Sequence, residues 1–89
     1  MYLANDNTIC AIATPQGIGA VSMVRVSGAQ TLDILKKLTH REQFNIRQAY
    51  LCEIFDDNDK LLDDAVIIFY KAPHSYTGED VAEIFIHGS

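Results

Sequence analysis

Short apolar runs separated by polar turns recur along most of the chain. They fall at residues 8–14, 20–27, 49–55, 65–70 and 81–87. Each run is rich in β-branched or aromatic residues and is bounded by Pro, Gly, Asp or Asn, which is typical of β-strands. The polar stretch 56–60 between the third and fourth runs has the composition of a hairpin loop. The pattern therefore predicts about five strands.

One segment has apolar residues at helical rather than alternating spacing. These residues are Leu32, Ile34, Leu35 and Leu38. Their spacing of three and four places them on one side of a helix. Ser27, with Gln30 three residues later, has the pattern of a capping box and predicts the N-cap. The sequence therefore predicts one clear helix after the second strand.

Helix and strands do not alternate regularly, so the pattern indicates an α+β fold with a small mixed β-sheet. Thr77, three residues before Asp80, predicts a short helical turn. Residues 66–70 are apolar on both faces, which favours a central strand covered on two sides. Only two residues follow the last predicted strand, so that strand would leave an open sheet edge if the domain ended there. We expect instead an incomplete domain whose covering elements follow Ser89.

Composition limits the classes of function. With 89 residues, 48% of them hydrophobic, the chain is at most one small globular domain. Its net charge of −5 gives no general attraction to nucleic acid or to anionic membranes. Cys10 and Cys52 form no C-x-x-C pair and are expected to be small buried residues in a reducing compartment. Without a signal-like or membrane-spanning run, the sequence predicts a soluble cytoplasmic domain.

Two charged residues interrupt apolar faces of the predicted strands. Arg25 and Glu83 both occupy alternate positions where apolar side chains are expected. A carboxylate in such surroundings is costly unless it is paired, so Arg25 and Glu83 are candidates for a structural ion pair. Alternatively, Glu83 accepts two N–H donors from an aminopyrimidine-type ring, with Phe85 or Tyr76 near the ring face, and Arg25 binds a carboxylate. The spacing leaves both interpretations open.

Other motifs support less chemistry. The glycine-containing turn at residues 14–20 lacks the third glycine and following helix of a dinucleotide site, and no Gly-Lys-Ser/Thr triplet of a P-loop is present. No strand-turn-helix elbow surrounds Ser75, and no third ligand accompanies Glu83 and His87. We expect neither a catalytic residue nor a metal site. The chemically diverse loop at residues 72–80 is instead typical of a segment shaped for a ligand or partner.

Several motifs occur in a characteristic order. They are Asn7-Thr8-Ile9, Ala13-Thr14-Pro15-Gln16-Gly17, Val24-Arg25-Val26-Ser27-Gly28, Leu62-Asp63-Asp64-Ala65 and Pro73-His74-Ser75-Tyr76-Thr77-Gly78-Glu79-Asp80. Together they closely resemble the N-terminal domain of the MnmE (TrmE) family of tRNA-modifying GTPases, over nearly the whole chain. Gln16, Ala20 and Ser89 depart from the family pattern, which more often has proline, glycine and glycine there.

The resemblance implies that residues 1–89 are a truncated dimerisation and folate-binding domain, similar to tetrahydrofolate-binding domains of one-carbon enzymes. It implies a homodimer with a 5-formyl-tetrahydrofolate-like reduced folate at the interface. Arg25 and Glu83 match family folate contacts. Glu83 would read the pterin edge, Arg25 would neutralise an anionic or carbonyl group, and the turn at residues 15–20 would wall the pocket.

For the full-length parent, the resemblance implies wobble-uridine modification of tRNA together with an MnmG-type FAD protein. GTP, Mg and K would belong to a P-loop GTPase domain absent from these residues. This segment alone would not be catalytic. The alternative hypothesis is a non-catalytic dimerisation or interaction module without ligand binding, in which Arg25 and Glu83 only pair with each other.

Overall fold

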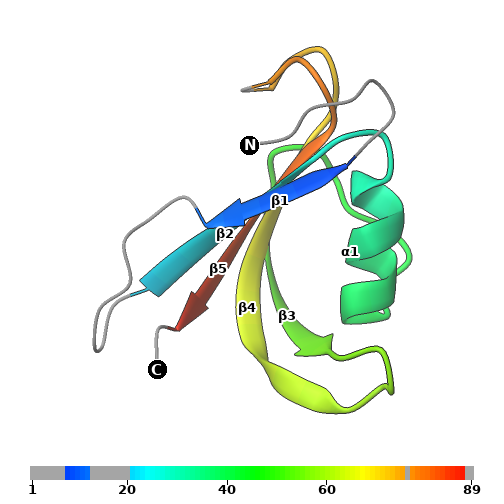
Figure 1. Cartoon of the computed structure of the whole chain (residues 1–89), viewed down its shortest axis with the longest axis vertical. Helices are drawn as coiled ribbons and strands as arrows, with labels where there is room; N and C mark the ends of the chain where they lie inside the picture. Colours follow the sequence, from blue (N-terminus) through cyan, green and yellow to red (C-terminus); the bar gives the residue numbers. More distant parts are fainter. Residues whose placement is uncertain (1–7, 13–20, 76, 88–89) are drawn as a thin grey trace.

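The computed structural model describes residues 8–12, 21–75 and 77–87. In this part of the chain, one helix packs against one five-stranded sheet (Figure 1). The elements are β1 (Ile9–Ile12), β2 (Val21–Ser27), α1 (Thr31–Thr39), β3 (Ala49–Phe55), β4 (Leu61–Tyr70) and β5 (Val81–His87). The predicted α+β class, with five strands and one helix, is confirmed.

The strand order is β1-β2-β5-β4-β3, and all four pairings are antiparallel. The mixed sheet expected from the sequence is therefore not formed by these strands. The helix α1 connects β2 to β3, and because these two strands are not neighbours, the connection creates no parallel pair. The last strand, β5, lies at the centre between β2 and β4. β5 is therefore no edge strand, so the alternative of an open edge at the last strand is wrong, and the edges of the described sheet are β1 and β3.

Helix α1 covers one face of the sheet and buries the core there (Figure 1). Leu35 of the helix and Ile67 of β4 are fully buried, as is Ala82 of β5. Along β3 the side chains alternate between exposed and buried, as expected for a strand with one solvated face. Val66 of β4 is 36% exposed on the face opposite the helix. The predicted two-sided covering of residues 66–70 is thus not provided by the described residues.

The start of α1 differs from the predicted capping box. Gln30 occupies the N-cap position, and Ser27 is the last residue of β2, where it pairs with Val81. Because the sheet holds its backbone, the Ser27 hydroxyl bonds to the hydroxyl of Thr77 at 2.8 Å instead. Thr31 secures the helix by donating from its hydroxyl to the Gly28 carbonyl oxygen at 2.8 Å. None of the described helices is long and apolar enough to cross a membrane.

Two further predictions concern the loops. The hairpin loop at residues 56–60 is confirmed, and the Asp56 carboxylate closes it by accepting the N–H groups of Asn58 and Lys60. The helical turn predicted at Thr77 is not formed in the described part of its loop. There the Thr77 hydroxyl accepts the N–H of Glu79 at 3.2 Å.

The two cysteines lie in different environments. Cys52 is buried in the core, as predicted, and burial raises the pKa of its thiol while the charge of Arg41 partly opposes the shift. Cys10 is exposed, so the expectation that it is buried is wrong. It belongs to the edge strand β1, which pairs only with β2.

Gly28 links β2 to α1 at a point of very close approach. Its φ is +141°, and a Cβ there would lie 2.5 Å from Oγ1 and 2.6 Å from Cα of Thr8.

We expect Gly28→Ala to lower the free energy of unfolding by about 2–4 kcal/mol, because backbone strain and overlap with Thr8 add. Gly78→Ala is the matched control. The φ of Gly78 is also positive, at +79°, but a Cβ added there would have no non-neighbouring atom within 4 Å. Gly78→Ala should cost about 1 kcal/mol. Equal losses in urea unfolding would contradict the close-packing explanation.

Candidate functional site

Arg25 and Glu83 meet on the sheet face opposite α1. Arg25 of β2 and Glu83 of β5 are direct register partners, and Arg25 Nη2 lies 3.2 Å from Glu83 Oε2. The Glu83 side chain is only 8% exposed, whereas that of Arg25 is 28% exposed. The structure therefore brings together the two residues that the sequence singled out. The burial of Glu83 makes a cationic partner necessary, since an unpaired buried carboxylate is strongly unfavourable.

Tyr70 is a third member of the site. It ends β4, and its hydroxyl donates a hydrogen bond to Glu83 Oε1 at 2.7 Å. Each carboxylate oxygen thus has one partner: Arg25 on one and Tyr70 on the other. Sequence reasoning did not identify Tyr70, because its contact depends on the register between β4 and β5. The only signal was a polar-tipped aromatic residue at the end of an apolar run.

The Glu83 carboxylate retains hydrogen-bonding capacity toward a ligand. An ionised carboxylate has about four lone-pair sites, and the hydrogen bonds from Arg25 and Tyr70 take one on each oxygen. The remaining sites accept hydrogen bonds only, so a fitting ligand presents N–H or O–H donors. Because Arg25 and Tyr70 hold the carboxylate, its orientation is fixed before any ligand arrives.

A row of apolar side chains crosses the same face beside this pair. Leu51, Val66, Phe85 and Met23 are successive register partners on β3, β4, β5 and β2. We call these four residues the apolar row. Leu51 is 77% exposed, while Phe85 and Met23 are half-buried. The site therefore borders a strip of sheet whose side chains are exposed at Leu51 and Val66.

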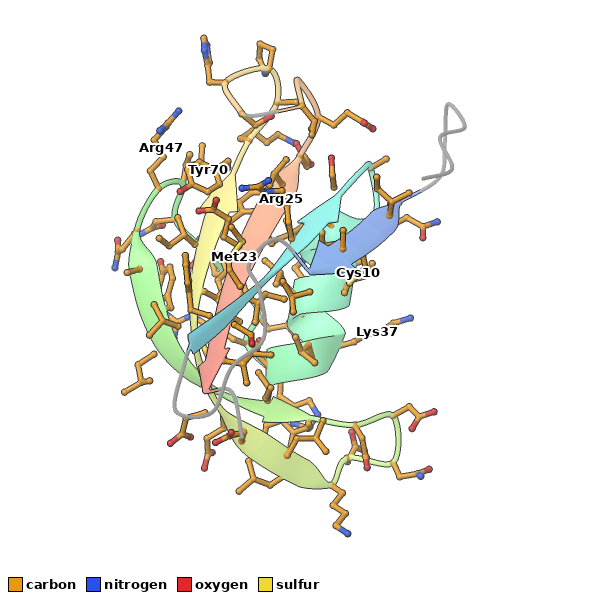
Figure 2. The ribbon with its side chains drawn as sticks, turned by 60° about the vertical axis from the view of Figure 1, so that its left-hand side comes forward. Cys10, Met23, Arg25, Lys37, Arg47 and Tyr70 are labelled. Atoms are coloured by element: carbon orange, nitrogen blue, oxygen red, sulfur yellow. The ribbon has the colours of Figure 1, made fainter. Side chains whose placement is uncertain are left out.

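The loop at residues 71–80 lies at the end of the sheet that carries Arg25 and Tyr70 (Figure 2). Asp80 fixes the base of this loop, because its carboxylate accepts the N–H of Ala72 at 2.9 Å and pairs with Lys71 at 3.3 Å. An open pocket of about 460 Å³ lies beside the loop. Its lining residues are Arg47, Tyr70, Pro73, His74 and Ser75.

Some predicted site features lie outside the described residues. They are Tyr76 and the turn at residues 15–20. Phe85, the other aromatic candidate, is described: it is half-buried and lies two residues from Glu83 in the chain. Among the described residues, no group of three or more His, Cys, Asp or Glu side chains is placed to hold a metal ion.

A small antiparallel α+β domain with a part-buried Arg–Glu pair on the sheet face opposite its helix is the class that the geometry defines. The family described as "GTP-binding protein TrmE N-terminus" matches residues 8–89. The chain therefore belongs to the TrmE N-terminal family, which confirms the resemblance seen in its motifs.

Full-length relatives share the similarity. The chain is 54% identical over 87 residues, or 98% of its length, to a tRNA modification GTPase MnmE from Helicobacter pylori (strain J99). It is 46% identical over 84 residues to the MnmE of Sulfurimonas denitrificans and 44% identical over 83 residues to that of Campylobacter jejuni. In each case it covers 19% of the relative. The chain thus spans about a fifth of the length of these curated relatives.

The hydrogen bond from Tyr70 to Glu83 is open to a direct energetic test. We expect Tyr70→Phe to lower the free energy of unfolding by about 1–2 kcal/mol, because it removes a donor to a buried carboxylate. In a Glu83→Ala background the same change should cost much less. Tyr50→Phe is the control, since the Tyr50 hydroxyl accepts the N–H of Asn45 instead. Each tyrosine variant is combined with Glu83→Ala in a double-mutant cycle, and chemical denaturation of the wild type, the two single mutants and the double mutant gives the coupling energy. If the effects of Tyr70→Phe and Glu83→Ala simply add, the contact between these residues is ruled out.

Proposed function

We propose that this chain binds a reduced folate at Glu83 and Arg25 and dimerises through the same sheet face, as part of a tRNA-modifying GTPase. The observation that carries the proposal is the buried Glu83 carboxylate, held by Arg25 and Tyr70 with acceptor capacity to spare. Membership of the TrmE N-terminal family supports it, as do relatives whose names describe tRNA modification GTPases.

The folate assignment follows from complementary hydrogen bonding. The pterin of a 5-formyl-tetrahydrofolate presents adjacent N–H donors on its aminopyrimidine edge, and a fixed carboxylate accepts such a pair in parallel. Arg25 then supplies positive charge beside the carboxylate for a carbonyl or anionic group of the ligand. The half-buried Phe85, two residues along β5, offers an apolar surface for the ring.

In the parent protein, this segment carries the one-carbon donor and takes no catalytic part. GTP hydrolysis, with Mg and K, belongs to a P-loop domain outside these residues. Wobble-uridine modification of tRNA in the cytoplasm involves an MnmG-type FAD protein. The net charge of −5 fits this division, because an acidic domain is poorly suited to grip RNA phosphates.

The apolar row supports the dimer. Leu51 and Val66 are cross-strand partners with exposed side chains, and Phe85 and Met23 extend the row across β5 and β2. A second copy that covers the row removes this surface from water, which is the main favourable contribution to association. The acidic side chains of Glu53 and Asp64, the next register pair on the same face of β3 and β4, would lie at the rim.

A second candidate function is an interaction module without ligand. The direct ion pair between Arg25 and Glu83 favours it, because each residue already neutralises the charge of the other. The two functions differ in their response to added folate, since a ligand that binds only the folded state raises its stability by mass action.

The folate proposal predicts ligand-dependent stabilisation. In the full-length protein, 5-formyl-tetrahydrofolate at 100 times its Kd should raise the free energy of unfolding by about 2.7 kcal/mol. Glu83→Ala should abolish the effect, and Arg25→Ala should weaken affinity at least about tenfold, because each removes a charged partner of the ligand. Lys60→Ala, a change of an exposed loop cation, is the control. Isothermal titration calorimetry and thermal melts measure both quantities. A wild-type protein that folate does not stabilise would favour the interaction module.

The dimer proposal predicts that a charge in the apolar row weakens association. Leu51→Lys should raise the dimer dissociation constant at least about tenfold, because it places an ammonium in a desolvated interface. Leu61→Lys is the matched control, since Leu61 is 51% exposed near the hairpin loop and outside the apolar row. Sedimentation velocity over a concentration series measures the constant. If both variants dimerise like the wild type, the interface lies elsewhere.

A further inference from the structure

We propose that Arg47, together with Tyr70 and His74, forms a carboxylate subsite that binds the glutamyl tail of the folate. This inference rests on the proposed folate function. It assigns a role to a cation that neither the sequence motifs nor the Arg25–Glu83 pair accounts for.

The backbone of Arg47 is held firmly beside β4. Its φ is +61°, in the left-handed region that residues other than glycine adopt infrequently. The Arg47 N–H donates to the Phe69 carbonyl oxygen at 2.8 Å, and the preceding Ile46 forms a parallel bridge with the same residue. These contacts place Arg47 next to Tyr70, the residue that follows Phe69.

The Arg47 side chain is held at two points. Its Cζ lies 5.2 Å from the centre of the Tyr70 ring, and Nη2 donates to the His74 carbonyl oxygen at 3.2 Å. A guanidinium has five N–H donors in a planar fork, which suits two parallel hydrogen bonds to a carboxylate. The hydrogen bond to His74 uses one of them. Arg47 also lines the pocket of about 460 Å³, so its side chain borders an open space.

Charge pairing separates Arg47 from the neighbouring cations. Arg25 is paired with Glu83 and Lys71 is paired with Asp80. Within the described residues, no acidic side chain forms an ion pair with Arg47. In a chain with a net charge of −5, a positioned arginine without an acidic partner is well suited to an anionic group of a ligand.

Tyr70 joins the two parts of the site. Its hydroxyl contacts Glu83 and its ring lies 5.2 Å from Arg47 Cζ, so one side chain contacts both the acceptor and the cation. Figure 2 shows Arg47, Tyr70 and Arg25 at the same end of the sheet, next to the 71–80 loop. A folate has the matching polarity, with N–H donors on its pterin and carboxylates on its glutamyl tail. In this arrangement the pocket beside Arg47 and His74 would receive the glutamyl carboxylates of the folate.

The test compares two probes in the full-length protein by isothermal titration calorimetry. One is 5-formyl-tetrahydrofolate, and the other is 5-formyl-tetrahydropteroamide, which lacks the glutamate and carries no carboxylate. The wild type should bind the glutamate-bearing probe about tenfold or more tightly, as expected for a charge-assisted pair. Arg47→Gln should remove this preference and leave the affinity for the pteroamide within about twofold. Arg47→Lys should retain part of it, and Lys37→Gln, on α1 at the other face of the sheet, should retain all of it.

Each outcome separates the subsite from the folate site itself. Arg47→Asn should behave like Arg47→Gln, since asparagine tolerates the left-handed backbone. If the Arg47 variants weaken both probes equally, or the wild type does not discriminate between them, the tail subsite is wrong while folate binding stands. If the wild type binds neither probe, the proposed folate function fails and the subsite with it.

Discussion

Strand β5 is hydrogen-bonded on both sides, to β2 and to β4, and its side chains alternate between two very different environments. Ala82 and Ile84 point into the core beneath α1, whereas Glu83 lies on the opposite face, across from Arg25. A slip of one residue in either pairing would carry the carboxylate into the core and the apolar side chains out of it. The burial of Ala82 and Ile84 therefore positions Glu83 as well.

A part-buried ion pair is a poor means of stabilising so small a domain. Removing Arg25 and Glu83 from water has a desolvation cost that their attraction offsets only in part, and hydrophobic residues of similar volume often stabilise as well or better. A chain of 89 residues has a narrow margin of stability. The pair therefore argues for a use beyond folding, and its position beside an exposed apolar row and an open pocket suggests binding.

The sequence was informative wherever local pattern determines structure. Alternation and helical spacing predicted five strands and α1, and the break in alternation was enough to select Arg25 and Glu83. Features that depend on tertiary pairing were missed or wrong. Tyr70 and Arg47 join the site only because β4 pairs with β5 and the segment before β3 bonds to Phe69. Likewise, the position of β5 at the centre of the sheet follows from pairing over long sequence separations, which local pattern does not specify.

The two halves of the proposed function share one surface, which has a thermodynamic consequence. Phe85 belongs to the apolar row and lies two residues from Glu83 on the same face of β5. A second copy seated on the row would cover the border of the folate site and exclude water from the Glu83 carboxylate, where hydrogen bonds to a ligand are stronger in the lower dielectric. Coupling of this kind is reciprocal, so a ligand that binds the dimer more tightly also tightens the dimer by the same factor. Association and folate binding are then one linked equilibrium, with the register of β5 holding both surfaces in place.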